Sequence, residues 1–193
     1  MKKLAVLFCA LCVLGLPAFA GIDQGINKGM IHLSVMGGFA APISDYEDDI
    51  AFGGNGATYG AQLMLHGTQY FGIGAEFNMT NFEKEKTDGI DYSADIMRFM
   101  VAMKFTFSPE AKTRFYIPLG VGMAKYRAKL GGTDESCTKP AAYAGLGVEA
   151  DLNDIFIVGG EARYNAWMVD KEKFGDTKYL SDVSLLLKLG IKF

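Results

Sequence analysis

Apolar and polar residues alternate one by one along most of this chain, and the end of the sequence shows the pattern best. There Leu185, Leu187 and Leu189 fall on one side of an extended backbone, while Ser184 and Lys188 fall on the other. A period of two residues predicts β-strands, because successive side chains of a strand point to opposite faces. Eight segments carry this pattern, each about ten residues or longer. They are Met30–Phe39, Thr58–His66, Tyr70–Asn81, Ala94–Phe107, Arg114–Tyr126, Ala141–Leu152, Ile155–Asn165 and Leu180–Phe193.

The connections between these segments differ in length in a regular way. Short ones alternate with longer polar ones, as expected when short turns line one rim of a membrane barrel and longer loops the other. The sequence therefore predicts an all-β, eight-stranded antiparallel up-and-down transmembrane β-barrel with both termini on the short-turn side. Pro118 lies inside the fifth strand and cannot donate a ladder hydrogen bond, so we expect a bulge or local break there. The short connections are Gly67–Gln69, Ser108–Thr113 and Asn153–Asp154, and the longer ones are Ala40–Ala57, Phe82–Ser93, Arg127–Pro140 and Ala166–Tyr179.

One face of every predicted strand is apolar, and the other is small, polar or charged. A lipocalin-like soluble barrel would turn the apolar face inward, and a membrane barrel would turn it outward against lipid. The second face is rich in glycine, for example Gly72, Gly120 and Gly145. Glycine weakens an exposed strand, whereas a narrow eight-stranded barrel needs small residues inside. We therefore expect the apolar face to contact lipid.

The first twenty residues have the features of a secretory signal peptide. Met1–Lys3 is basic, Leu4–Leu16 is apolar, and Ala18–Ala20 is a small-x-small cleavage signature. The apolar run is shorter than the about 20 residues that a spanning helix needs, so a retained anchor is the weaker alternative. We expect residues 1–20 to be a signal peptide and residues 21–193 one barrel domain in the outer membrane.

Composition narrows the function further. The net charge of −3 gives no basic field that would attract nucleic acid. Cys9 and Cys12 leave with the signal peptide, so the mature chain retains Cys137, and no internal disulfide is expected. This residue falls in the third long connection, where we expect its thiol to face the outside of the cell.

Aromatic residues gather at the short-turn ends of the strands, on the apolar face. Such a position predicts an aromatic girdle at the periplasmic interface. The predicted girdle consists of Phe71, Phe107, Phe115, Phe156 and Phe193, and the sparser candidates for an outer girdle are Phe39, Tyr59 and Tyr164.

Charged residues on the inward face predict a network inside the barrel. In a lumen formed by eight strands, side chains just fill the interior, and charges there must pair or stay hydrated. Because the signs are mixed, we expect salt bridges that close the lumen, with a small gated ion pathway as the alternative. The candidates near mid-membrane are Glu76, Arg98, Glu161, Arg163 and Lys188, and those nearer the periplasmic turns are Lys104 and Glu149.

The two histidines of the chain, His32 and His66, are candidates for catalysis or metal binding. Both are predicted to face inward at similar depth near the periplasmic rim. That is the wrong end for chemistry on outer-leaflet lipid, although Ser34 follows His32 as a His-x-Ser pair. We therefore expect no enzyme activity, no cofactor and no metal site, and we interpret both histidines as residues packed in the lumen.

Three stretches carry a resemblance to a known family. Phe115–Gly122, Gly159–Asn165 and the end Leu187–Phe193 are similar to the outer membrane protein beta-barrel domain family, which includes opacity-type adhesins and the transmembrane domain of outer membrane protein A. The resemblance implies that Leu189, Ile191 and Phe193 form the sorting signal read by the barrel assembly machinery. It also implies a lumen closed by charged pairs. The motifs specify the barrel and leave the activity open.

The remaining candidates for function lie on the surface. The first long connection holds four acids within Asp45–Asp49, which we interpret as a solvated loop, with a divalent cation bridging to lipopolysaccharide phosphates as the alternative. We expect a monomer in contact with outer-membrane lipid and lipopolysaccharide, with a structural or surface-interaction role and a host or surface ligand bound through loops. The alternatives are a small porin or ion channel and, third, a lipid-A-modifying enzyme.

Overall fold

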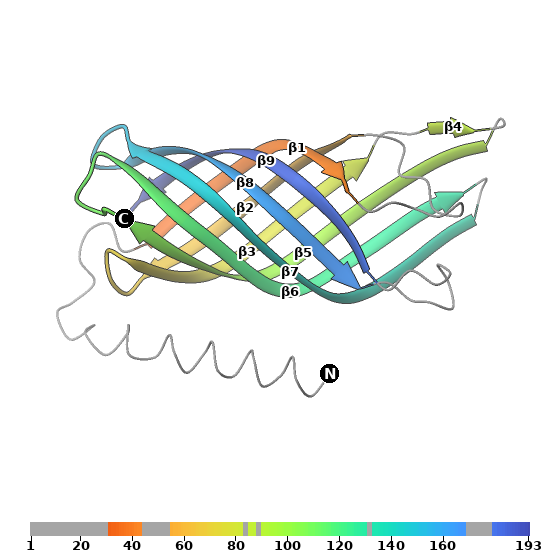
Figure 1. Cartoon of the computed structure of the whole chain (residues 1–193), viewed down its shortest axis with the longest axis horizontal. Helices are drawn as coiled ribbons and strands as arrows, with labels where there is room; N and C mark the ends of the chain where they lie inside the picture. Colours follow the sequence, from red (N-terminus) through yellow and green to blue (C-terminus); the bar gives the residue numbers. More distant parts are fainter. Residues whose placement is uncertain (1–30, 44–54, 83–84, 88–89, 131–132, 169–178) are drawn as a thin grey trace.

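The computed structural model describes residues 31–43, 55–82, 85–87, 90–130, 133–168 and 179–193, and these residues form one closed barrel (Figure 1). The predicted signal peptide, the acidic run in the first long connection and parts of other connections lie outside this range. The strands are β1 (Ile31–Pro42), β2 (Gly56–His66), β3 (Phe71–Phe82), β4 (Glu85–Thr87), β5 (Ile90–Phe107), β6 (Thr113–Leu130), β7 (Thr133–Asp151), β8 (Phe156–Met168) and β9 (Tyr179–Lys192).

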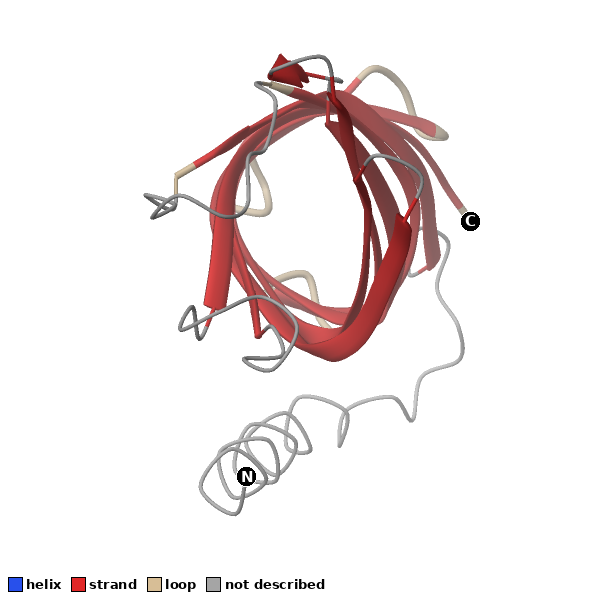
Figure 2. Ribbon diagram, turned by 90° about the vertical axis from the view of Figure 1, so that its right-hand side faces the viewer, coloured by secondary structure: helices blue, strands red, loops and turns tan. Residues whose placement is uncertain are grey.

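Each barrel strand pairs antiparallel with its neighbours. The order is β3-β2-β1-β9-β8-β7-β6-β5, and an additional β3–β5 pairing closes the ring, as the end-on view in Figure 2 shows. Strand β4 is a three-residue segment paired with the start of β5 outside this ring. The predicted eight-stranded antiparallel barrel is therefore confirmed. Among the described residues, no helix is long and apolar enough to cross a membrane.

Three adjacent strands of the wall are longer than predicted. Strands β5 and β6 each have 18 residues and β7 has 19, whereas a tilted membrane strand needs about ten. Their periplasmic ends are aligned by the Phe107↔Phe115 pair, so the excess lies at the other end, where Tyr92 pairs with Leu130. Figure 1 shows this extension beyond the remaining strands.

This extension corrects two predictions. Most of the connections Phe82–Ser93 and Arg127–Pro140 consists of paired strand, with β6 and β7 in register to their ends. Cys137 consequently lies within β7, opposite Tyr126, and it is packed against buried apolar residues. The sequence did not reveal these strands because beyond the membrane the outer face no longer needs to be apolar. The alternation therefore fades although the backbone pairing continues.

Of the two outcomes expected at Pro118, a bulge or a local break, the structure shows the local break. Strand β6 runs through it, and β5 pairs with it at Lys104↔Pro118. Toward β7, Tyr116↔Gly147 and Leu119↔Ala144 belong to the same register, with pairing interrupted between them. A bulge would shift this register by one residue. The missing donor therefore costs local hydrogen bonds and leaves the alignment intact.

The alternation has the predicted direction. Apolar side chains of β9 point outward, with Leu187 74% exposed, while Lys188 on the opposite face is 4% exposed. The apolar face is therefore the wall of the barrel and the polar face its lumen.

Candidate functional site

The lumen gathers the charged residues that the sequence placed on the inward face. All seven predicted residues lie there, from five different strands, and each is between 1% and 4% exposed. They are Glu76, Arg98, Lys104, Glu149, Glu161, Arg163 and Lys188. Ionised groups so far from solvent are stable only when partners satisfy them, so their contacts decide what the lumen can do.

Glu76 of β3 is the centre of the network. Its carboxylate accepts hydrogen bonds from Gln62 at 2.7 Å, Asn78 at 2.8 Å and the Tyr143 hydroxyl at 3.0 Å. Arg163 of β8 reaches it from across the barrel with both terminal nitrogens, and Nη2 lies 2.9 Å from Oε2. Such charge-assisted, two-pronged contacts are the strongest hydrogen bonds available to side chains.

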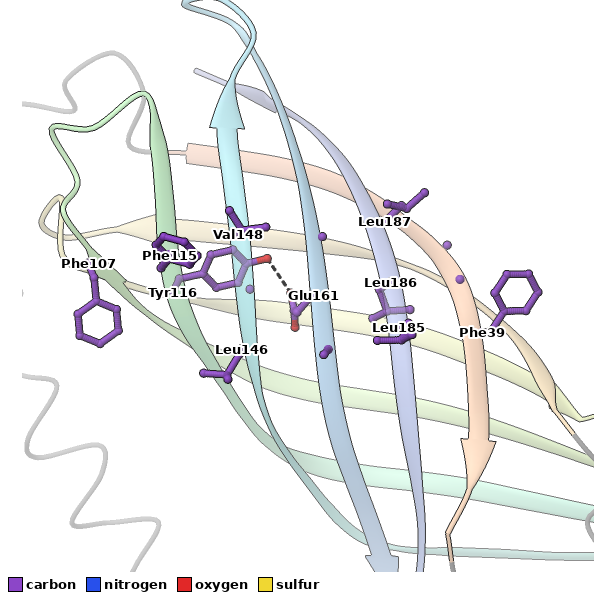
Figure 3. Close-up of a pocket in the computed structure, with 15 residues that line it drawn as sticks. Phe39, Phe107, Phe115, Tyr116, Leu146, Val148, Glu161, Leu185, Leu186 and Leu187 are labelled. Atoms are coloured by element: carbon purple, nitrogen blue, oxygen red, sulfur yellow. Dashed lines mark hydrogen bonds between the residues drawn. The ribbon is translucent and has the colours of Figure 1, made fainter.

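Glu161 continues the network toward the periplasm. Arg163 pairs with it through Nε, and the Nζ of Lys188 lies 3.2 Å from its Oε2. The Tyr116 hydroxyl donates to it at 2.9 Å, the hydrogen bond drawn in Figure 3. Lys188 also donates to the Gln62 side chain at 2.9 Å. Glu76, Glu161, Arg163 and Lys188 thus form one connected group, which we call the central network.

Arg98 is paired differently from the expectation. Its partner is Asp182 of β9, a residue absent from the predicted set, and Arg98 also donates to Thr80 at 2.9 Å. Asn165 holds the same aspartate at 2.6 Å, and Ser184 holds it at 2.8 Å. The alternation places Asp182 on the inward face, but only the strand register shows that it lies opposite Arg98. The predicted set therefore omitted it.

A second charged group fills the periplasmic end of the lumen. Lys104 lies 2.5 Å from Glu149, and Arg114 contacts both Glu149 at 3.3 Å and Asp151 at 2.6 Å. Lys192 adds a contact to Asp151 at 3.0 Å. Lys104 and Glu149 were predicted, whereas Arg114, Asp151 and Lys192 were missed, because residues near strand ends are hard to separate from turns by sequence pattern alone.

Two tyrosines missing from the sequence prediction fix the cations in place. The Tyr143 ring lies over Gly120 of the neighbouring strand, so near that an added Cβ would come within 2.1 Å of it. The Tyr116 ring lies over Gly147 in the same way, at 2.2 Å. Arg163 stacks 4.2 Å from the Tyr143 ring centre. A tyrosine opposite an inward glycine is a sequence signal that could have found both residues.

The charges of the predicted residues and Asp182 balance. Arg98, Lys104, Arg163 and Lys188 carry four positive charges, and four carboxylates lie against them. Breaking one buried pair leaves its partner uncompensated, which typically costs about 3–5 kcal/mol. The arrangement therefore suits a rigid polar filling. Among the described residues, no cluster of three or more histidine, cysteine, aspartate or glutamate side chains could hold a metal ion.

The extracellular end of the lumen is filled by apolar side chains. They are part of a larger buried cluster that continues toward the periplasm through Met64, Met100 and Tyr143, and the members at this end come from seven of the eight barrel strands. We call this ring the apolar belt, and its members are Ala40, Phe82, Ile96, Tyr126, Ala141, Trp167 and Leu180. Arg98 marks its lower boundary, because its guanidinium lies 4.9 Å from the Trp167 ring centre.

The two histidines meet at the periplasmic end, as their spacing suggested. Their ring centres are 4.1 Å apart with the planes tilted by 40°, and the other side of the His66 ring lies against Gly72. When two imidazole rings touch through their faces, the lone pairs of their nitrogens lie in the ring planes and do not converge on one point. This geometry favours packing over metal ligation.

On the outer face, the structure places four of the five predicted girdle residues in the open. Phe107, Phe115, Phe156 and Phe193 are between 49% and 67% exposed at the periplasmic ends of their strands. Phe71 is the exception at 7%, because its ring packs against Phe105, with ring centres 5.1 Å apart. The outer-rim candidates Phe39, Tyr59 and Tyr164 are also exposed.

A shallow hollow of about 650 Å³ lies on the outer face where β7, β8, β9 and β1 run side by side (Figure 3). It lies over Gly37 and Gly160, which flank Leu187 in register and have open space where a side chain would be. Phe39, Leu146 and Leu185 border it. In a membrane this hollow faces lipid, and its lining is mostly apolar, with Tyr116 and Glu161 among the lining residues.

Comparison with known proteins agrees with this architecture. The model of the outer membrane protein beta-barrel domain matches residues 6–193. No curated protein sequence matches the chain.

Several solved structures share this fold, although their sequence identity to the chain is low. Neisserial surface protein A is 14% identical, with a TM-score of 0.63 over 86% of this chain and 99% of its own. Ail, the attachment invasion locus protein of Yersinia pestis, in complex with the heparin analogue sucrose octasulfate, is 17% identical, with a TM-score of 0.53 over 86% and 98%. OprG of Pseudomonas aeruginosa is 15% identical, with a TM-score of 0.53 over 88% and 98%. At sequence identities this low, the comparison shows that the fold is shared and nothing further.

Proposed function

The chain belongs to the outer membrane protein beta-barrel domain family and resides in the outer membrane, and from this premise we propose that it is a non-transporting, non-catalytic anchor whose extracellular side interacts with surface ligands. The observation that carries the proposal is the asymmetry of the wall. Strands β5, β6 and β7 continue several residues past the length needed to cross the membrane. Loops and edges on a rigid scaffold are where binding function concentrates.

The chemistry of this extension favours an anionic ligand. On its outer face Lys125 is exposed next to Thr138, and Arg127 is half-buried between Ser136 and Asp95, so Lys125 is the exposed charge of this group. Ail, which shares the fold, is recorded with a sulfated heparin analogue. We therefore propose sulfated or phosphorylated surface glycans as the ligand class, with lipopolysaccharide as the surrounding lipid.

The filled lumen supports the absence of transport. The central network and the apolar belt bury their side chains almost completely. A wide aqueous pore needs about 16 strands, whereas this barrel closes with eight. The purified protein should therefore show no steady current in a planar bilayer. A steady current in potassium chloride would favour the small-channel alternative.

Adhesion of cells that express the protein tests the surface role. We expect a deletion strain to bind heparin-coated surfaces less than the complemented strain. The double variant Lys125→Glu with Arg127→Glu should behave like the deletion strain, while Ser136→Ala should not. Equal binding by all four strains, with the protein confirmed at the surface, would contradict the proposal.

Assembly is a further part of the proposal. Leu189 is 57% exposed and Phe193 55% exposed, and both lie with Ile191 on the outward face of the last strand. We propose that these three residues are read by the barrel assembly machinery, and that the folded product is a monomer. Phe193→Ala should lower the amount of folded protein in the outer membrane without changing the stability of the protein refolded in vitro.

A further inference from the structure

We propose that two barriers in series close the lumen, and that the apolar belt blocks ions independently of the charged network. This inference rests on the proposed non-transporting lumen and adds which residues close it. Paired charges alone would make a gate that opens when one pair rearranges. A second, apolar barrier in series would keep the lumen shut while the charges exchange partners.

The belt is a complete ring by its own geometry. Ile96, Tyr126, Trp167 and Leu180 belong to one buried cluster, and each is 0% to 2% exposed, so solvent does not reach them. Strand β2 contributes Gly56, and the Phe82 ring occupies the space beside it, 2.9 Å from where a Cβ would be. Every strand of the barrel therefore either supplies an apolar side chain to the belt or is covered by one.

The belt members carry no charge, and their polar atoms are the Tyr126 hydroxyl and the Trp167 indole nitrogen. An ion that leaves water loses many kcal/mol of hydration unless polar groups replace its shell, and an apolar constriction excludes water as well. Two charges border it: Arg98, which is committed to Asp182 and to Thr80, and the half-buried Lys139, which shares the inward face of β7 with Ala141. The indole nitrogen of Trp167 has no hydrogen-bond partner among the described residues. The uncharged belt and the charged network therefore differ in chemistry, and they touch at Arg98 and Trp167.

Four proteins distinguish a lumen closed by one barrier from a lumen closed by two. Each is refolded in lipid and recorded in planar bilayers with potassium chloride. They are the wild type, the network variant Arg163→Ala, a belt variant with Ile96→Thr and Leu180→Asn, and the combination of the three substitutions. The polar replacements in the belt keep much of the side-chain volume while admitting water. Phe99→Ala on the outer face is the control for general loosening.

We expect no current steps from the wild type, the control, the network variant or the belt variant, and clear steps from the combination. Conduction by Arg163→Ala alone would overturn the inference, because the belt would then be no barrier. A closed combined variant would overturn it as well. Conduction by the wild type would instead overturn the proposed function, so the two failures are distinguishable.

Folding of each variant is checked by its mobility on a detergent gel without boiling, because closed barrels resist detergent unfolding. Where the combined variant does not fold, the milder pair Ile96→Thr and Arg163→Lys replaces it. That pair keeps the positive charge, yet it loses the planar two-pronged contact to Glu76. The same current criterion then applies.

Discussion

Strand β9 carries two surfaces that differ in how they are stabilised. On its outer face, Leu185, Leu187 and Leu189 are between 57% and 74% exposed. On its inner face, Asp182 and Lys188 are at most 4% exposed and each contacts several named partners. The outer face needs only apolar character, since lipid adapts to its shape. The inner face needs a specific partner for each polar atom, because an unpaired buried charge is costly.

Because of this difference, the same substitution should change the stability of the barrel by different amounts on the two faces. A change of size is tolerated outside, where the hollow over Gly37 and Gly160 is open. The same change inside meets backbone or an aromatic ring. A change of charge should be costly on both faces, for the separate reasons of lipid contact outside and lost pairing inside.

The largest effect is expected for Glu76→Ala. This change leaves Arg163 without its main carboxylate and removes the acceptor of Tyr143, Gln62 and Asn78. The free energy of unfolding in lipid should fall by about 3–5 kcal/mol. Urea titration followed by tryptophan fluorescence measures it. Glu110→Ala in an exposed turn is the matched control and should change little.

Leu187→Arg tests the outer face near mid-membrane. A charged side chain there should destabilise the barrel by about 2–4 kcal/mol, because it must leave water or deform the bilayer. The same urea titration measures this loss. Leu152→Arg, in a periplasmic turn where the side chain is 63% exposed, should cost far less. Equal losses at both positions would argue against a lipid-facing wall at Leu187.

Two glycine substitutions compare the faces directly. Gly120→Ala drives a methyl group into the Tyr143 ring, 2.1 Å away, and should destabilise the protein by about 1–3 kcal/mol. Gly160→Ala enters open space, where the nearest atom is 3.8 Å away, and should be neutral within about 0.5 kcal/mol. Thermal unfolding of both variants in the same lipid gives the difference. A neutral Gly120→Ala would mean that the Tyr143 ring moves without cost.

The smallest effect concerns Cys137. Its side chain packs against the apolar belt, whereas that of the neighbouring Thr138 is exposed on the outer face. A membrane-impermeant maleimide should therefore label whole cells slowly through Cys137. It should label the double variant Cys137→Ser with Thr138→Cys faster, with no loss of stability in either protein. Faster labelling of Cys137 would place its thiol on the outer surface.

The sequence predicted the barrel because membrane strands must alternate strictly. Positions such as Leu187 and Lys188 meet lipid and lumen in turn, so their order in the chain decides their face. The same reasoning failed beyond the membrane, where the outer face of β6 and β7 carries polar residues such as Lys125 and Thr138. It also failed for Phe71, because alternation gives the direction of a side chain and says nothing of the neighbouring ring that covers it.

By itself, then, the sequence determined the strand number, the direction of each face and the seven inward charges, since all of these follow from a period of two residues. The partners of the charges were decided only by the tertiary structure. Arg98 meets Asp182 across 84 residues of chain, and Arg163 meets Glu76 across 87. Such contacts depend on the register of all eight strands and on how the ring closes between β3 and β5. Because no local pattern encodes that closure, the apolar belt and the pairing inside the lumen emerge only when the barrel is complete.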